Sequence, residues 1–157
     1  MHVHGIDIHT HIVPDRFPAY AGKGRDVPWP SMEHPPACNH AHVIISGKNY
    51  RTVEHTCWDT SARVKEMDAM RIGRQALSPM PELLSYWFDP EDGRAMCRHL
   101  NDTIANMVTR EPARFYGLGC VPLQDVEAAI EELAYVMKTL KLSGVEVDRK
   151  ILADLAV

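Results

Sequence analysis

The stretch Asp7-Ile8-His9-Thr10-His11 is the most informative part of this chain, and it leads directly into Ile12-Val13-Pro14. An apolar run over residues 3–8 predicts a strand, which the proline brings to an end. Side chains alternate faces along a strand, so we expect Asp7, His9 and His11 to share one face. Two imidazoles at the end of one strand can both reach one metal ion.

The H-x-H spacing alone is not specific, because it occurs three times among nine histidines: at His2/His4, His9/His11 and His40/His42. Only the middle pair combines a preceding apolar strand, a nearby acidic residue and a following proline. His2/His4 stands at the end of the chain, where solvated side chains are expected. Cys38 beside the third pair suggests a second metal site, but a solvated loop is the stronger interpretation.

The composition is that of one soluble globular domain, with 157 residues, 45% hydrophobic and 24% charged. A net charge of −4 gives no basic field for nucleic acid, and no apolar run has the length of a membrane span. The four cysteines are irregularly spaced and form no C-x-x-C, which favours free thiols. With no basic and apolar leader visible, we expect a cytoplasmic protein.

The remaining pattern alternates strands and helices. A proline-rich stretch over residues 14–36 precedes a hairpin, predicted over 42–46 and 49–54 around Gly47. Helices are predicted over 60–70, ended by Gly73, over 91–110, and over 126–140 with Ile130, Leu133 and Met137 facing inward. Strands are predicted over 74–78, 115–121 and 144–147. Such alternation predicts βαβ units and a parallel sheet.

Several short blocks, in order and at plausible spacing, resemble the amidohydrolase superfamily, specifically its aminocarboxymuconate-semialdehyde decarboxylase branch. The resemblance runs from Gly5 to about Val147. The blocks are Asp7–His11, Tyr50-Arg51, Cys57-Trp58-Asp59, Arg63–Asp68, Gln75–Ser78, Ser85-Tyr86-Trp87 and Arg114–Gly119.

This resemblance implies an α/β fold, the N-terminal half of a TIM-type (β/α)8 barrel with a small hairpin insertion after the first strand. It implies that His9 and His11 bind a divalent metal, usually zinc, and that Arg51 binds the carboxylate of a small-molecule substrate. The implied activity is a metal-dependent decarboxylase, or carboxy-lyase. The alternatives are a metal-dependent amidohydrolase or lactonase, and a non-catalytic fragment that associates with a partner. No catalytic residue can be assigned.

The chain is shorter than the family fold requires, because a complete barrel of this type takes about 250 residues and this chain has 157. Residues 1–147 are predicted to form a partial barrel and residues 148–157 a divergent C-terminal tail. We therefore expect a truncated half that is weakly active or inactive alone. Bare sheet edges favour a homo-oligomer or a self-associating fragment.

Overall fold

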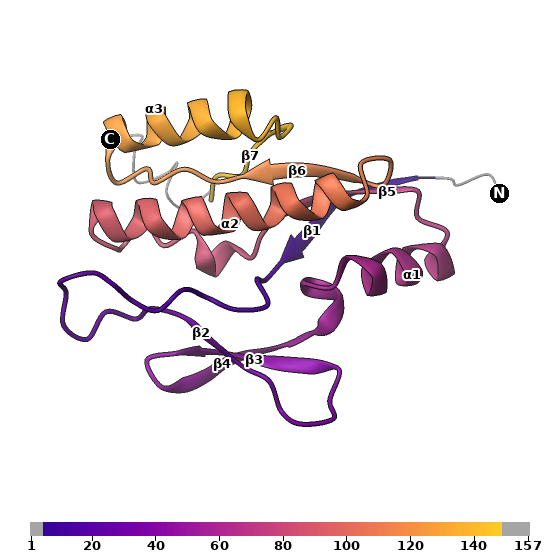
Figure 1. The fold of residues 1–157 in the computed structure, drawn as a ribbon, viewed down its shortest axis with the longest axis horizontal. Coiled ribbons are helices and arrows are strands. Elements are labelled where there is room, and N and C mark those ends of the chain that lie inside the picture. The colour runs from indigo at the N-terminus through magenta and orange to yellow at the C-terminus, as the bar shows by residue number, and fades with distance from the viewer. Residues whose placement is uncertain (1–4, 149–157) are drawn as a thin grey trace.

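The computed structural model describes residues 5–148, and its centre is a four-stranded parallel sheet (Figure 1). The strands are β1 (Ile6–Ile12), β5 (Arg74–Pro79), β6 (Phe115–Gly119) and β7 (Gly144–Val145), paired in that order. All three pairings are parallel, and helices connect β5, β6 and β7. The predicted α/β partial barrel is confirmed. The predicted tail lies outside the described residues, except for Asp148.

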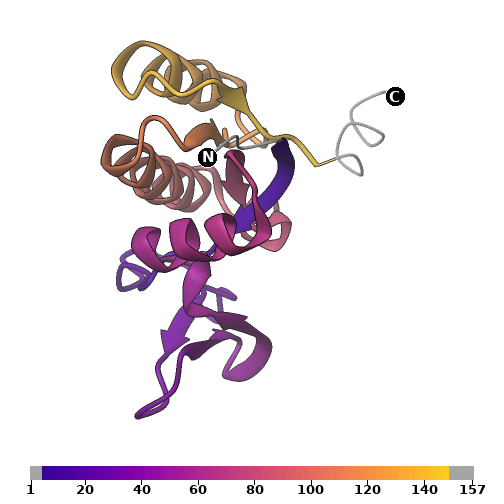
Figure 2. The same cartoon turned by 90° about the vertical axis from the view of Figure 1, so that its right-hand side faces the viewer.

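The insertion after β1 forms a separate antiparallel sheet, which β1 points toward (Figures 1 and 2). Its strands are β2 (Ser31–Glu33), β3 (His40–Ile45) and β4 (Lys48–Glu54). Ser46 and Gly47 both have positive φ, at 51° and 72°, as a tight hairpin turn requires. The predicted hairpin is confirmed, whereas β2, inside the proline-rich stretch, was not predicted.

Helix α1 (Thr60–Met70) begins where predicted, because the Asp59 side chain accepts a hydrogen bond of 3.0 Å from the Ala62 amide. The prediction that Gly73 ends it is wrong: Arg71 takes the left-handed conformation, with φ 59°. Arg63, a buried residue of this helix, donates a hydrogen bond of 2.8 Å to the His11 carbonyl and one of 3.2 Å to Gln75. Burial lowers the pKa of Arg63, while these acceptors satisfy its donors.

Helix α2 (Pro90–Arg110) supplies the apolar side chains that cover the sheet. Met96, Leu100 and Ile104 are fully buried, in agreement with the predicted apolar face. Ile104 packs in one cluster with Ile12 of β1 and Leu77 of β5, and Leu100 packs in a second cluster with residues of the insertion. The hydrophobic core therefore lies between the sheet and its helices and continues beneath the antiparallel sheet. A short 3₁₀ helix, η2 (Pro81–Leu83), follows β5.

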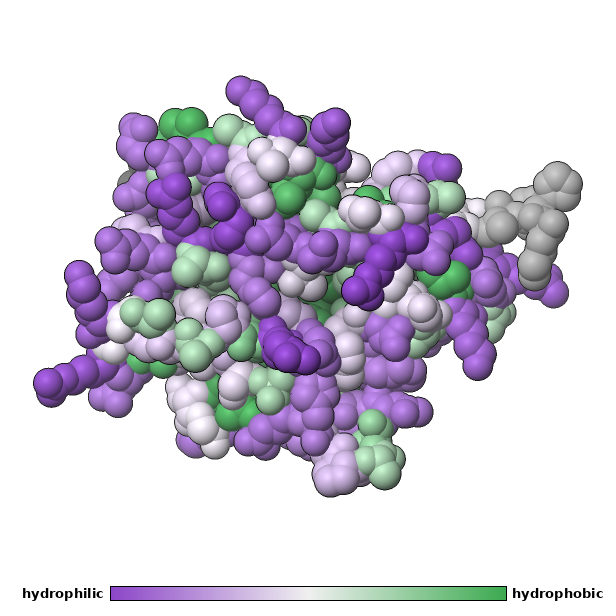
Figure 3. Space-filling model, in the orientation of Figure 1, coloured by the Kyte–Doolittle hydropathy of each residue, from purple (hydrophilic) through white to green (hydrophobic). Residues whose placement is uncertain are grey.

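Helix α3 (Val126–Ala134), continued by the π-helical turn η3 (Tyr135–Thr139), shows the largest departure from the sequence prediction. Val136 is buried, but Ile130, Leu133 and Met137 are 57%, 41% and 44% exposed, so their predicted inward orientation is wrong. Together with Val126 they form an apolar stripe on the outer surface, visible as green at the top of Figure 3, over α3. Glu132, which is fully buried, occupies the inward face instead.

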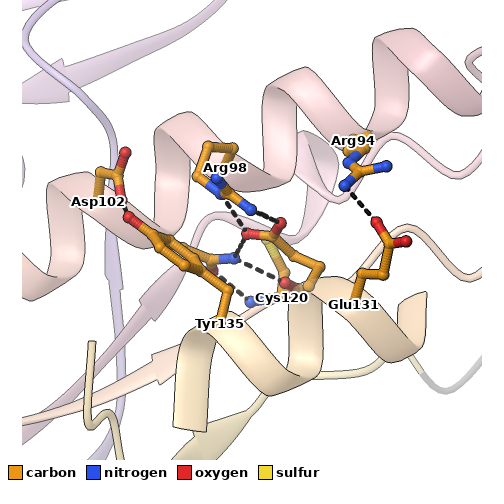
Figure 4. A network of polar contacts seen from close by, with 8 residues as sticks. Arg94, Arg98, Asp102, Cys120, Glu131 and Tyr135 are labelled. Carbon is orange, nitrogen blue, oxygen red and sulfur yellow. Dashed lines mark hydrogen bonds and ion pairs between the residues drawn. The ribbon is translucent and has the colours of Figure 1, made fainter. Parts of the chain in front are cut away.

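A polar network explains this orientation of α3 (Figure 4). The Arg98 side chain on α2 donates three hydrogen bonds of 2.7–3.1 Å to the Glu132 carboxylate. Asn101 donates a hydrogen bond of 2.8 Å to the same carboxylate. Its side-chain amide also donates to the Cys120 carbonyl and accepts from the Cys120 amide. The network fixes the packing of α2 on α3 and holds the chain where it leaves β6. Buried carboxylates are tolerated when their oxygens are satisfied in this way.

We predict that Glu132→Ala lowers the free energy of unfolding by about 3 kcal/mol, because it removes the acceptor of the hydrogen bonds from Arg98 and Asn101. The matched control is Glu131→Ala, which removes the neighbouring exposed pair with Arg94. That change should cost about 0–1 kcal/mol. Urea unfolding of both variants measures the difference, and equal losses would contradict the assignment.

Candidate metal and carboxylate site

The sequence Asp7–His11 forms a β-bulge rather than a regular strand. Asp7 pairs with Gln75 but Thr10 pairs with Leu77, so Ile8 and His9 together oppose Ala76. The Asp7 carboxylate accepts a hydrogen bond of 3.2 Å from the His9 amide, and the Thr10 hydroxyl donates one of 2.8 Å to the Ala76 carbonyl. These two side chains thus bond to backbone groups at the bulge.

The bulge corrects one prediction about the faces of β1. The bulge shifts the alternation of side chains along β1 by one residue. Asp7 therefore lies on the same face of the sheet as Gln75, which is the face that the helices cover, and His11 lies on the opposite face. His9 and His11 stay together, with ring centroids 5.0 Å apart in an edge-to-face arrangement. The two imidazoles therefore converge, without Asp7, where β1 ends.

Contacts to β5 fix the orientation of the His11 ring. Its Nδ1 lies 3.0 Å from the Pro79 carbonyl and 3.1 Å from the Ser78 hydroxyl, which itself donates to the Thr10 carbonyl. A carbonyl oxygen only accepts, so the proton of a neutral ring is on Nδ1. Nε2 then carries the lone pair that a metal requires. Histidines that bind metals usually donate their other ring N–H to a carbonyl or carboxylate, as His11 does to Pro79.

Glu146, at the end of β7, is a nearby acidic residue that sequence reasoning did not single out. Its Oε2 lies 3.9 Å from His11 Nδ1 and is buried without a hydrogen-bond partner among the described residues. The signal available in the sequence was a carboxylate near the carboxyl end of the strand predicted over 144–147, since the ends of parallel strands meet at one edge of a sheet.

The two histidines fit a shared divalent metal through the chemistry of their donors. Within residues 5–148, however, no group of three histidine, cysteine or acidic side chains is arranged to hold an ion. A catalytic zinc normally takes three protein ligands. This part of the chain thus provides a pair of ligands rather than a complete shell.

Arg51 on β4 forms an ion pair with Glu82, with 2.9 Å between Nη2 and Oε1. Glu82 belongs to η2, which directly follows β5. The antiparallel sheet is therefore attached beside the end of β5 that contacts His11. The substrate-binding role of Arg51 remains a prediction.

Other candidate groups have different surroundings. His40 and His42 on β3 also have neighbouring rings, 5.4 Å apart, but His42 Nδ1 is bonded to Thr52 at 2.9 Å. All four cysteines are free, as predicted. Contact with Cys97, together with burial, raises the pKa of the Cys120 thiol, so it stays protonated and is a poor nucleophile or ligand.

A cavity of about 550 Å³ lies away from the histidine pair. Its lining combines the segment after β1 with α1 and α2: Pro14, Arg16, Asp59, His99, Thr103 and Arg110. None of its lining residues is His9, His11 or Arg51. Among residues 5–148, no helix has both the length and the apolar character needed to cross a membrane.

A parallel α/β sheet with a histidine pair where its first strand ends is an arrangement typical of metal-dependent barrel enzymes. The amidohydrolase family model matches residues 6–150, and the chain belongs to this family.

The relatives of this chain include decarboxylases. It is 36% identical over 146 residues to the 2-amino-3-carboxymuconate-6-semialdehyde decarboxylase of Dictyostelium discoideum, covering 93% of this chain and 40% of the relative. The 2,6-dihydroxybenzoate decarboxylase structure from Rhizobium is 32% identical with a TM-score of 0.56, over 60% of this chain and 29% of that one.

A dihydroxybenzoic acid decarboxylase structure from Polaromonas, with bound manganese and 2-nitroresorcinol, is also 32% identical. Its TM-score is 0.52, over 55% of this chain and 26% of that one. A divalent metal is therefore present in a member of the same family. The chain spans about 40% of the length of the Dictyostelium relative.

Proposed function

We propose that this chain provides the first metal ligands and a carboxylate-binding arginine of a metal-dependent carboxy-lyase. The observation that carries the proposal is the His9/His11 pair, with neighbouring rings and with His11 Nε2 left free by the contacts of Nδ1. The similarity to decarboxylases supports carbon–carbon bond cleavage rather than hydrolysis.

Within this proposal His9 and His11 hold the metal, and zinc is the ion we propose because imidazole nitrogens suit it well. A divalent metal at this position would stabilise negative charge that develops on the substrate as CO₂ departs. Ser78 and Pro79 keep the His11 ring in place, and Glu146 adds negative charge near Nδ1. These residues act by positioning and electrostatics.

Arg51 is proposed to bind the carboxylate of the substrate. The Arg51 side chain is 53% exposed and uses Nη2 for Glu82, so its other donors can make charge-assisted hydrogen bonds to a carboxylate. Holding the substrate at two points, the metal and Arg51, would align the bond that breaks. The four unpaired thiols support a reducing, cytoplasmic environment.

We further propose that the 157-residue chain alone has little turnover and tends to self-associate. Two histidines leave a metal with incomplete protein ligation, and an open sheet does not exclude water. The edge strand β1 exposes Ile6 and Ile8, at 56% and 78%, and α3 exposes its apolar stripe. Exposed apolar surface, combined with a strand edge that has no partner strand among the described residues, favours association between copies.

We predict that His9→Ala and His11→Ala each reduce Zn²⁺ affinity by roughly tenfold or more, because each removes one of two protein ligands. His42→Ala is the matched control, taken from the other histidine pair that the structure describes. Competition with a chromophoric chelator measures all three variants. An equal loss in the control would place the metal elsewhere.

The activity is tested with the purified 157-residue chain loaded with Zn²⁺ or Mn²⁺. We expect little or no CO₂ release from 2-amino-3-carboxymuconate 6-semialdehyde or from 2,6-dihydroxybenzoate. Robust turnover that disappears on His9→Ala would contradict the expected low activity while supporting the metal role. Hydrolysis of a lactone without CO₂ release would favour the amidohydrolase alternative.

Association is tested by sedimentation velocity at increasing protein concentration. We expect concentration-dependent oligomers that weaken in Ile130→Lys, which places a charge in the middle of the apolar stripe. Glu127→Lys, an exposed position on the same helix outside the stripe, is the control. A monomer at all concentrations would rule out this proposal.

A further inference from the structure

The cavity of about 550 Å³ between α1, α2 and the segment after β1 has no part in the proposed function. Its inner wall is apolar, because Pro14 and Met107 are buried and Trp58 is half-buried. The Trp58 ring packs against the hydrophobic core and edge-to-face on His34, with 5.4 Å between ring centroids. The cavity therefore offers a fixed apolar surface of the kind on which a planar ring packs well.

The outer lining of the cavity carries hydrogen-bond donors that are not in use. Asn106 and Arg110 are exposed and lie one turn apart on α2, so their side chains are neighbours on one face of the helix. Neither side chain has a hydrogen bond or ion pair with another residue in the range 5–148. A guanidinium and a side-chain amide at this spacing can both donate to one carboxylate.

The two acidic residues of the lining are already engaged. Asp59 accepts a hydrogen bond of 3.0 Å from the Ala62 amide, as the cap of α1. Asp15 forms an ion pair of 3.4 Å with Arg16, the other arginine of the lining. The unpaired charge in the lining is therefore the positive charge of Arg110, which favours an anionic ligand over a neutral or cationic one.

We propose that this cavity is a second ligand site, which takes a planar aromatic carboxylate. Arg110 and Asn106 bind the carboxylate, and the ring packs on the apolar wall that Met107 and Trp58 provide. Binding needs both parts: the charge-assisted hydrogen bonds orient the ligand, and burial of the ring supplies most of the driving force. The site is independent of the metal and carboxylate site, since neither the histidine pair nor Arg51 lines it.

Three compounds separate the contributions of charge and ring: 2-naphthoate, its neutral counterpart 2-naphthamide, and acetate, which has the charge without the ring. Binding to the full 157-residue chain is followed through the indole N–H signal of Trp58 in NMR spectra, identified by its loss in Trp58→Phe. EDTA keeps metal from His9 and His11. We expect 2-naphthoate to shift the signal saturably, 2-naphthamide to bind about tenfold more weakly, and acetate to leave it unmoved at the same concentration.

Two arginine variants test the position of the carboxylate. Arg110→Gln should weaken 2-naphthoate about tenfold and leave 2-naphthamide unchanged, because only the charged ligand uses the guanidinium. Arg94→Gln, which removes an exposed arginine from the same helix outside the cavity, is the matched control and should leave both affinities unchanged. Equal losses for both ligands in Arg110→Gln would mean that the substitution disturbs the structure, and would overturn the carboxylate contact.

Arg51→Ala and His9→Ala separate this site from the proposed function. Unchanged binding of 2-naphthoate in both variants supports a second site, whatever the outcome of the metal and turnover experiments. Loss of binding in either variant would place the ligand at the histidine and Arg51 site and overturn the inference. Equal affinity for 2-naphthoate and 2-naphthamide in the wild type, or no movement of the Trp58 signal with either, also overturns it.

Discussion

The parallel pairing of β1 with β5 is the constraint on which the site depends. It brings residues 67 or 68 positions apart in sequence into register, and the bulge opposite Ala76 sets which side chains face the helices. Through this pairing Pro79 and Ser78 orient His11, while Arg63 bonds both to the His11 carbonyl and to Gln75. The ring of His11, the candidate metal ligand, is thus held by contacts between strands rather than by a flexible loop.

The ion pair between the buried Glu132 and the partly exposed Arg98 fixes the packing on the helical side. Apolar periodicity alone would place Ile130 and Leu133 against α2, but the satisfied carboxylate of Glu132 takes that position (Figure 4). Removing Glu132 from the network would leave Arg98 and Asn101 short of acceptors, which is more unfavourable than exposing a few apolar side chains. The consequence is an apolar stripe on α3 that remains available for contacts with another surface (Figure 3).

The candidate site combines a histidine with a fixed ring, His11, and an arginine that is paired with a carboxylate, Arg51. His11 is preorganised by its Nδ1 contacts, and Glu146 contributes a buried carboxylate oxygen close by. Arg51 is not an isolated positive charge, because Glu82 is its partner.

The alternation of elements, the hairpin and the histidine pair could be predicted from the sequence, because they follow from local periodicity, turn residues and motif spacing. The candidate arginine was indicated only by the resemblance to the family. The sequence did not determine the inward face of α3, the position of Asp7 opposite to His11, or the partners Glu82 and Glu146. Those depend on long-range hydrogen bonds and ion pairs between segments distant in sequence. Only the tertiary structure decides which donor meets which acceptor, and a single bulge or a single buried carboxylate reverses what local patterning predicts.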